Sequence, residues 1–129
     1  MYKDVLSDLQ ALFSTYNALG TVVLAGDFNS QLINGPINKM KHSKKHIFTK
    51  FVLDNNLRDV VKLRPSNDPS YTYVPAKTLI DHVLVENDYI DNIRSANIVP
   101  ETEVLTSDHL PIKVTLKIQT VMRKTAELQ

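Results

Sequence analysis

The chain has 129 residues, of which 43% are hydrophobic and 22% are charged, values that are ordinary for one globular domain. A formal net charge of +1 excludes a strong electrostatic field of either sign, so nucleic-acid binding would need a local basic patch. The absence of cysteine excludes a disulfide framework and thiolate metal sites.

No apolar run approaches the roughly 20 residues that a membrane-spanning helix needs. The first eight residues mix charged and apolar side chains and lack the apolar core of a secretory signal. We therefore expect an intracellular protein, nuclear or cytoplasmic, with no membrane partner.

The first third of the chain predicts a helix, a strand and a loop. Apolar residues recur at helical spacing in the first segment: Val5, Leu9, Leu12 and Tyr16. Gly20 is a stop signal for this helix. Residues 21–25 are apolar and β-branched, which predicts a strand buried on both faces. Residues 30–43 have the composition of a loop.

A second helix is expected after Ser43, which has the side chain of a helix cap. Its apolar face would hold Ile47, Phe48, Phe51 and Val52. Short strands are predicted at residues 59–63, 71–74, 79–85, 93–99 and 112–118. In the last of these, apolar and polar residues alternate, which is typical of a strand with one buried face.

This order of elements predicts an α/β fold with one mixed β-sheet and helices on one of its faces. We expect residues 1–121 to form the domain and residues 122–129 to form a loose tail. The other sheet face is also apolar in the central strands, and the sequence shows no obvious segment to cover it.

The first candidate site is Gly-Asp-Phe-Asn at residues 26–29, directly after the predicted buried strand. Loops at strand ends are common positions for functional groups. Asp27 and Asn29 alternate with Phe28, so both polar side chains can point the same way. The alternative is an Asx turn that only ends the strand.

Two further stretches carry polar groups. Strand alternation places Asp81 among aliphatic side chains, where a carboxylate is costly without a partner such as histidine. His82 would lie on the opposite face, and we interpret it as a buried histidine satisfied by a backbone group. Asp108 and His109 come just before the last strand, where the alternative is an ordinary polar loop.

In this order and strand context, Gly-Asp-Phe-Asn, Ile-Asp-His-Val-Leu and Ser-Asp-His resemble the endonuclease/exonuclease/phosphatase superfamily. The resemblance is greatest to the apurinic-type endonuclease domains of non-LTR retrotransposons. It extends over residues 6–118 and includes Tyr-Thr-Tyr at residues 71–73 and Asn-Leu-Arg-Asp at residues 56–59.

The resemblance implies a role for each matching residue. Asp27 would activate the attacking water, and Asn29 would bind the scissile phosphate. His109 would stabilise the charge that develops on the phosphate, oriented by Asp81. Asp108 would lie at or beside a metal ion, with Asp27 as a second ligand. The implied cofactor is Mg²⁺, with Mn²⁺ as an alternative.

The superfamily domain is about twice the length of this chain, and its N-terminal half carries the principal glutamate ligand of Mg²⁺. The resemblance therefore implies half of a four-layer α/β/β/α sandwich. Because one half alone would leave an apolar sheet face in water, we expect a homodimer in which a second copy covers that face.

Four lysines of one basic stretch are candidates for contacts with nucleic-acid phosphates: Lys39, Lys41, Lys44 and Lys45. The alternative is a solvated loop and helix start.

Three hypotheses remain from the sequence. The first is a weak metal-dependent phosphodiesterase that hydrolyses nucleic acid. The second is a non-catalytic, retrotransposon-derived remnant that dimerises or binds nucleic acid. In the third, the chain is one fragment that pairs with a separate N-terminal half.

Overall fold

The computed structural model describes residues 2–37, 41–63, 69–103 and 107–118. The predicted tail at residues 122–129 and the candidate Lys39 lie outside these ranges. In the described residues, no helix has both the length and the apolar character that crossing a membrane requires.

Two helices pack on one face of a sheet, as the sequence predicts. They are α1 (Tyr2–Asn17) and α2 (Lys44–Asp54). Ser43 caps α2 in an extended conformation, and its Oγ accepts a hydrogen bond from the backbone N–H of His46 at 3.3 Å. The helices and the sheet enclose the largest core cluster: Leu6, Phe13, Phe48, Phe51, Val52, Leu57 and Leu84.

The strands form two antiparallel sheets. The first sheet has the order β1 (Val23–Asp27), β3 (Asp81–Glu86), β2 (Leu57–Asp59). The second pairs β4 (Ile93–Ile98) with β5 (Ile112–Leu116). The predicted α/β class and the helical face are thus confirmed, but the single mixed sheet is wrong. The 3₁₀ segment η2 (Asn87–Asn92) redirects the chain after β3, so that β4 begins a new sheet.

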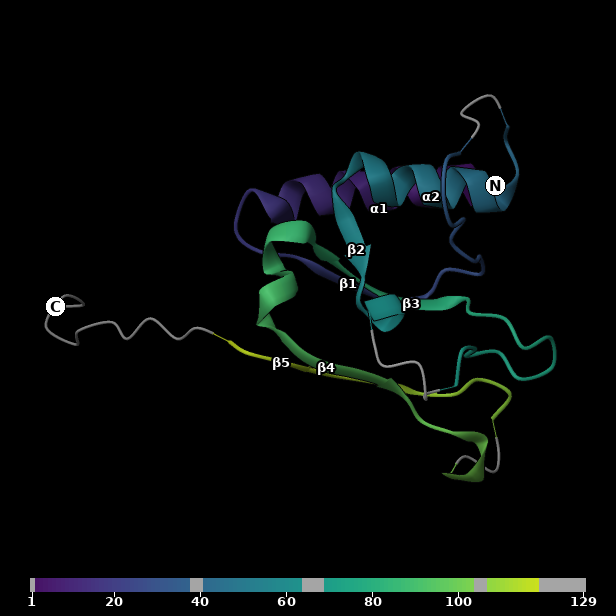
Figure 1. Cartoon of the computed structure of the whole chain (residues 1–129). Coiled ribbons are helices and arrows are strands. Elements are labelled where there is room, and N and C mark those ends of the chain that lie inside the picture. The colour runs from purple at the N-terminus through teal and green to yellow at the C-terminus, as the bar shows by residue number, and fades with distance from the viewer. Residues whose placement is uncertain (1, 38–40, 64–68, 104–106, 119–129) are drawn as a thin grey trace, which may run out of the picture.

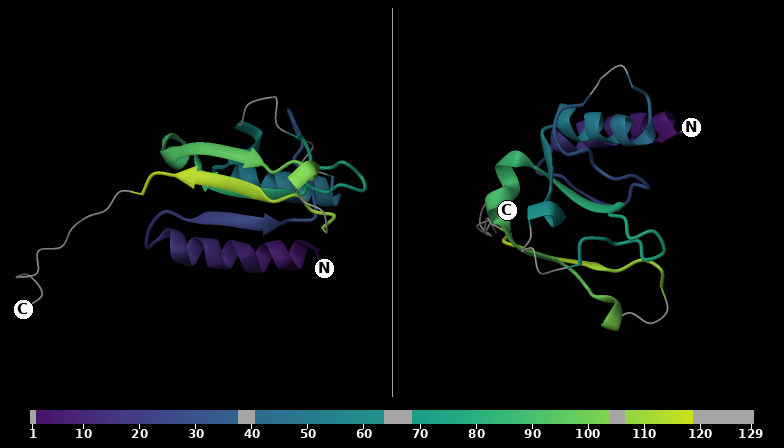
Figure 2. Two further views of the ribbon diagram at one scale, coloured as in Figure 1. Left: turned by 90° about the horizontal axis from the view of Figure 1, so that it is seen from below. Right: turned by 45° about the vertical axis from the view of Figure 1, so that its right-hand side comes forward.

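The two sheets and the helices form successive layers (Figure 1). The hairpin β4–β5 packs on the face of the first sheet that the helices leave free, and Ala96 and Val114 contact the cluster around Val60 and Val85. The expectation that the chain contains nothing to cover this face is therefore wrong. The hairpin covers only part of it, because β1 and α1 lie to one side of the hairpin in the left view of Figure 2.

Strand β1 is more exposed than the sequence predicts. Leu24 points toward the helices and packs against the core, whereas Val23 is 41% exposed and Ala25 is also exposed. The prediction of a strand buried on both faces is thus wrong in this chain. Because β1 is an edge strand beyond the reach of the hairpin, its second face opens to solvent.

Two predicted strands take other forms. Residues 60–63 form the 3₁₀ segment η1 (Val60–Leu63), because Asp59 Oδ1 accepts the Val61 N–H at 3.1 Å and bends the chain at the end of β2. Residues 71–74 make only isolated bridges, in which Tyr73 pairs with Thr78 and with His109. That tight return brings residues 71–78 beside the segment that precedes β5. A short 3₁₀ segment, η3 (Glu101–Glu103), follows β4.

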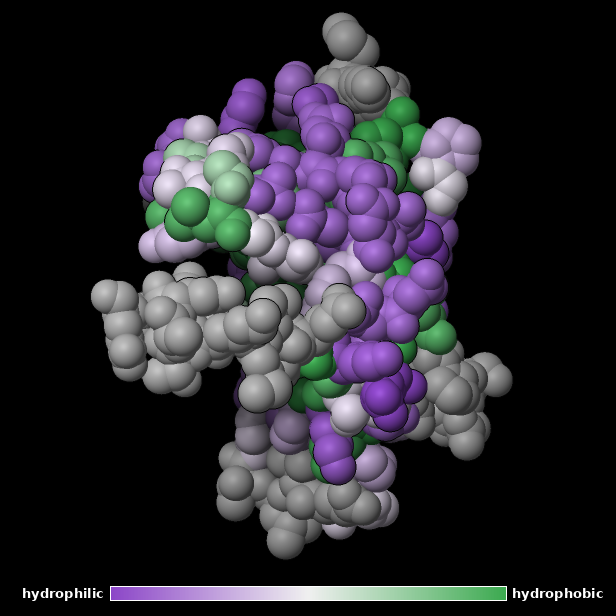
Figure 3. All heavy atoms as spheres, turned by 90° about the vertical axis from the view of Figure 1, so that its left-hand side faces the viewer, coloured by the Kyte–Doolittle hydropathy of each residue, from purple (hydrophilic) through white to green (hydrophobic). Residues whose placement is uncertain are grey.

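The last strand agrees with its sequence pattern up to Leu116, where β5 ends, whereas Ile118, expected on the buried face, is 74% exposed. Ile112, Val114 and Leu116 are partly buried, whereas Lys113 and Thr115 are exposed. The surface on the left-hand side of Figure 1 is largely hydrophilic, and hydrophobic groups appear there as separate small patches (Figure 3).

Candidate active site

Residues from the three sequence motifs meet where β1 ends and β3 begins. Asp27 ends β1 and Asp81 begins β3, and antiparallel pairing places the two residues directly opposite one another. His109 precedes β5 and bridges to Tyr73, whose ring centroid lies 5.2 Å from that of the imidazole. Pairing of distant strands thus gathers side chains separated by up to 82 residues in sequence, from Asp27 to His109.

The imidazole of His109 lies between the two carboxylates. Its Nδ1 is 2.8 Å from Asp81 Oδ2, and its Nε2 is 3.9 Å from Asp27 Oδ2. The Asp81 side chain is only 16% exposed, whereas those of His109 and Asp27 are 35% and 49% exposed. Asp81 is therefore a shielded partner of the imidazole, while Asp27 and the Nε2 edge remain open to an incoming molecule.

This surrounding shifts His109 toward its protonated form. The hydrogen bond from Nδ1 to Asp81 raises the pKa of His109 above its ordinary value of 6.5. Burial opposes this shift in pKa, whereas the negative charges of Asp81, Asp27 and Asp108 add to it. The arrangement favours an imidazolium that donates through Nδ1 and presents Nε2–H to the groove.

The loop after β1 holds Asp27 and Asn29 in a compact turn. Asp27 Oδ1 accepts the Asn29 N–H at 2.7 Å, which leaves Oδ2 facing His109. Asn29 adopts a left-handed conformation with φ of 52°, which asparagine tolerates better than most residues. The Asx turn and the candidate catalytic arrangement therefore coexist, because the carboxylate uses a different oxygen for each.

The backbone of Phe28 is fixed from both sides. Its N–H donates to Ile80 O at 3.0 Å, and its carbonyl accepts the Tyr2 hydroxyl at 2.8 Å. Burial raises the pKa of the Tyr2 phenol to about 12, so the hydroxyl remains a donor at neutral pH. Tyr2 was not singled out in the sequence, where its place in the first helical turn gives no sign of this contact.

Thr72 is a second residue that sequence reasoning missed. Its side chain is fully buried, and Oγ1 accepts the N–H groups of Ile80 at 3.3 Å and Asp81 at 3.2 Å. Its carbonyl accepts the Leu110 N–H at 2.7 Å. Thr72 thereby ties the segment that carries Asp81 to the segment that carries His109. The Tyr-Thr-Tyr pattern was a signal, but it did not reveal which residue makes the link.

His82 is buried beneath α2, in agreement with its interpretation as a satisfied core histidine. Nε2 contacts the carbonyl of Ser30 at 2.7 Å, and Nδ1 contacts Asp59 Oδ2 at 2.6 Å. The backbone partner was expected and the carboxylate was not. Strand alternation gave the face of His82, but no sequence pattern connects it to Asp59.

A groove of about 420 Å³ opens between β1 and the segment leading into β5. Asp27, Asp81 and His109 line its polar side, and Ala25 and Val83 contribute apolar wall. Water, a phosphate group and a divalent cation are all small enough to reach the open carboxylate in a groove of this size.

Among the described residues, Asp27, Asp81 and His109 form a group whose ligand atoms lie within 4.8 Å of one another. Asp108 is exposed and lies outside this group. Mg²⁺ is commonly held by one or two carboxylates together with waters and substrate phosphate. Asp81 is already engaged by His109, so the open carboxylate oxygen of this group belongs to Asp27.

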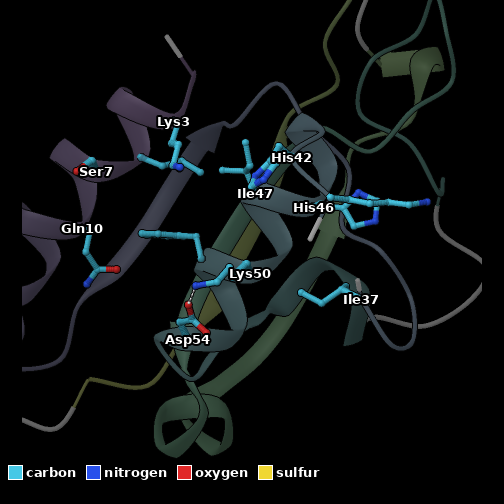
Figure 4. A pocket seen from close by; sticks show the side chains of 12 residues that line it. Lys3, Ser7, Gln10, Ile37, His42, His46, Ile47, Lys50 and Asp54 are labelled. Carbon is cyan, nitrogen blue, oxygen red and sulfur yellow. Dashed lines mark hydrogen bonds and ion pairs between the residues drawn. The ribbon is translucent and has the colours of Figure 1, made fainter. Parts of the chain in front are cut away.

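The basic stretch divides over two sides of α2. Lys41 lines a pocket of about 340 Å³ between α1 and α2, together with Lys3 and Lys50 (Figure 4). Lys44 lies over the ring of Tyr2, with Nζ 5.4 Å from the ring centroid.

Lys45 belongs to the other side of α2. Burial lowers the pKa of Lys62, Asp59 raises it, and the positive charge of Lys45 lowers it further, so Lys45 and Lys62 are electrostatic neighbours. Among the three candidate lysines that the structure describes, Lys45 therefore lies apart from Lys41 and Lys44.

Comparison with known proteins identifies a family whose sequence model matches most of the chain. The sequence model of the family described as endonuclease-reverse transcriptase matches residues 1–113. No curated protein matches this chain.

Solved structures share the fold. Similar structures include a 3′ phosphatase, NExo, from Neisseria bound to a product DNA hairpin (TM-score 0.65, 20% identity) and the 3′–5′ exonuclease NExo from Neisseria meningitidis (TM-score 0.63, 21% identity). Each comparison covers 88% of this chain and 52% of the other. The catalytic domain of Xenopus laevis APE2 is also similar, with a TM-score of 0.57 and 20% identity over 76% of this chain and 37% of that domain. The chain thus spans about half the length of the Neisseria proteins.

Proposed function

The chain belongs to the endonuclease-reverse transcriptase family, within the endonuclease/exonuclease/phosphatase superfamily, and we propose that it hydrolyses phosphodiester bonds of nucleic acid with the help of a divalent metal ion. The observation that carries the proposal is the Asp81–His109 pair at 2.8 Å, with the open carboxylate of Asp27 3.9 Å from the far side of the same imidazole.

The roles follow from the geometry. A water molecule in the groove attacks phosphorus and gives a proton to Asp27 as the phosphorus–oxygen bond to the leaving group breaks. Nε2–H of the His109 imidazolium donates to the phosphate oxygen on which negative charge develops. Asp81 holds the imidazole in this orientation, and the exposed Asn29 amide binds the phosphate. A bound Mg²⁺, held by Asp27 and Asp108, would supply additional positive charge to the phosphate.

We expect the activity to be weak. The proposed metal ligands are two exposed carboxylates, and Mg²⁺ bound through so few protein groups depends on substrate phosphate to complete its coordination. Mn²⁺ should substitute, because it also accepts carboxylate ligands.

Nucleic acid is the proposed substrate, and Lys41 and Lys44 are the proposed contacts to its backbone. Lys41 belongs to the pocket shared with Lys3, and Lys44 packs on Tyr2, whose hydroxyl binds the loop of Asp27 and Asn29. A strand leaving the groove can therefore follow the first turns of α1 and α2. Lys45, on the other side of α2, would contact a separate part of the backbone.

The proposed partner for the open part of the sheet is a second copy of this chain. Val23, Ala25 and Asp27 share the face of β1 that the hairpin does not cover. A two-fold arrangement would bury Val23 and Ala25 of both copies and bring two sets of acidic groups toward one groove.

A nicking assay tests the proposed activity. Supercoiled plasmid is incubated with wild-type protein, with Asp27→Asn and with Asp88→Asn, each with Mg²⁺, with Mn²⁺ and with EDTA. Asp88 is exposed on η2 and serves as a matched acidic control. We expect metal-dependent nicking by the wild type and the control, and a loss of about 100-fold in Asp27→Asn.

The alternative is a non-catalytic module that dimerises or binds nucleic acid. What favours it is the engagement of Asp81 by His109, which leaves the candidate metal group with few free oxygens. Equal background nicking by all three proteins, combined with retained binding to an oligonucleotide, would support that alternative.

A further inference from the structure

Two neighbouring residues of β3 hold two different loops of the proposed site. Asp81 points to one face of the sheet and binds His109, whereas His82 points to the other face and binds Ser30 and Asp59. His82 has no exposed surface, and Phe28 and Phe48 pack against it with ring centroids 5.9 and 5.0 Å away. A polar ring in this apolar setting is stable only with both nitrogens satisfied.

The partners of His82 define its hydrogen bonds. The Ser30 carbonyl can only accept, so Nε2 must carry the proton at that 2.7 Å contact. The contact of 2.6 Å between Nδ1 and Asp59 Oδ2 requires one proton between two buried groups, since the Asp59 side chain is only 1% exposed. Asp59 thus fixes Nδ1 and leaves Nε2–H directed at the loop after β1.

Ser30 directly follows Asn29, and Phe28 directly precedes it. The Phe28 backbone is bound by Ile80 and Tyr2, and the Ser30 carbonyl is bound by His82. Asn29, with its left-handed φ of 52°, is therefore held between two anchored neighbours. Without the His82 contact, the Ser30 carbonyl would lose its anchor, and the conformation of Asn29 would be held mainly from the Phe28 side and by the Asx hydrogen bond from the Asn29 N–H to Asp27.

We propose that His82 is a positioning residue for Asn29, and that Asp59 holds the His82 ring so that Nε2–H fixes the Ser30 carbonyl. This inference rests on the proposed function, in which Asn29 binds the scissile phosphate. Neither His82 nor Asp59 touches the substrate. The same strand then positions the imidazole of His109 through Asp81 and the amide of Asn29 through His82. The two phosphate-binding groups are thereby held at a fixed position relative to one another.

Two variants separate positioning from general stability. In Asp59→Asn, the new amide can donate to Nδ1 of a neutral His82, and its oxygen can still accept the Val61 N–H, so the contact with Ser30 survives. In the double variant Asp59→Asn with His82→Phe, the ring volume remains but the donor to Ser30 is lost. Neither variant leaves a buried charge without a partner.

Amide hydrogen exchange provides a readout that does not require activity. We expect the Asn29 amide to exchange about tenfold or more faster in the double variant, because the hydrogen bond from the His82 ring to the neighbouring Ser30 carbonyl is gone. The exchange rates of the Phe48, Phe51 and Val52 amides in α2 should differ from those of the wild type by no more than about twofold, after correction for any change in global stability. The single variant Asp59→Asn should resemble the wild type at both places. Unchanged exchange at Asn29, or equal acceleration across α2, would overturn the proposal.

Cleavage kinetics provide the second readout. With a fluorescent oligonucleotide and Mg²⁺, the double variant should lose about tenfold in kcat with KM within about twofold, whereas the single variant Asp59→Asn should keep the wild-type kcat. A rise in KM with kcat unchanged, or equal losses of kcat in both variants, contradicts a positioning role. If the wild type does not cleave at all, the proposed function fails, while the exchange result still decides whether His82 holds the loop.

A measurement on the wild type covers the case in which the double variant does not fold. The Nε2–H proton of His82 should be directly visible by nuclear magnetic resonance at neutral pH, because burial and the Ser30 carbonyl protect it from exchange. A His82 ring that carries no Nε2 proton would overturn the proposal.

Discussion

His109 is the residue on which the proposed chemistry depends, and its charge can be tested by titration. Because its folded-state pKa lies above 6.5, the stabilisation from the Asp81 pair is complete below about pH 6.5 and is lost as pH rises through the raised pKa. We expect the imidazole resonances of His109 to titrate with a midpoint above 6.5. In Asp81→Asn, the midpoint should move down toward the ordinary value. A wild-type midpoint at or below 6.5 would contradict the described pair.

Gly26 sets the direction in which β1 delivers Asp27. Its φ of 150° lies in the region that L-residues rarely adopt, although the surrounding space could hold a methyl group. Gly26→Ala should therefore lower the free energy of unfolding by about 1–3 kcal/mol through backbone strain alone. Gly20→Ala is the matched control, because Gly20 has equal space and no positive φ. Urea denaturation measures the free energy of unfolding of both variants. Equal values would contradict the proposed backbone strain at Gly26.

At the scale of residues, the sequence identified those site residues that also stand out from the pattern of their own strand. Asp27, Asp81 and His109 could be selected because each stands at a strand end or breaks an apolar alternation. Asp59 and Thr72 could not, since their roles depend on partners 23 and 9 residues away. A carboxylate that ends a strand and a threonine in a turn look ordinary until the chain is folded.

At the scale of elements, the turn at residues 71–78 connects two strands through Thr72. Thr72→Val keeps the shape but removes the acceptor of two backbone N–H groups, so we expect a loss of about 1–3 kcal/mol in the free energy of unfolding. Because Asp81 then loses its anchor, the His109 resonances should also shift. Thr115→Val on the exposed face of β5 should change stability by less than about 0.5 kcal/mol. Thermal unfolding of the two variants tests the difference.

Elements with a strong periodic pattern were predictable, and elements ended by a single side-chain contact were not. The cap at Ser43 gave α2, and alternation gave β3 and β5. The strand predicted at residues 59–63 failed because Asp59 folds its own carboxylate onto the Val61 N–H. Composition favours a strand at these residues, but a local hydrogen bond overrides it.

At the scale of the whole molecule, the layers explain both the site and the proposed partner. The hairpin β4–β5 covers the first sheet over β3 and η1 and leaves β1 uncovered beside the groove. The sequence implied an open apolar face, both from the apolar residues of the central strands and from the family resemblance. It could not show that part of this face is closed from within the chain, because the turn that separates the hairpin, η2, carries no clear breaker.

The proposed dimer is tested by light scattering at several concentrations. We expect a wild-type dimer and a monomeric Val23→Lys, because a charge at this partly exposed position would be buried against the second copy. Leu19→Lys is the control, since Leu19 is 81% exposed in the turn after α1 and is not part of β1. A wild type that stays monomeric at every concentration rules out the second copy as the partner.

The central claim is that Asp81 and His109 act as one unit in phosphodiester hydrolysis. Its most direct test is the single-turnover cleavage rate of an oligonucleotide with Mg²⁺, measured for wild type, Asp81→Asn, His109→Ala and the double variant. We predict that His109→Ala loses about 100-fold or more, and that the double variant loses no more than His109→Ala, because Asp81 acts only through the imidazole. Cleavage at the wild-type rate by His109→Ala, or losses that multiply in the double variant, would contradict this account.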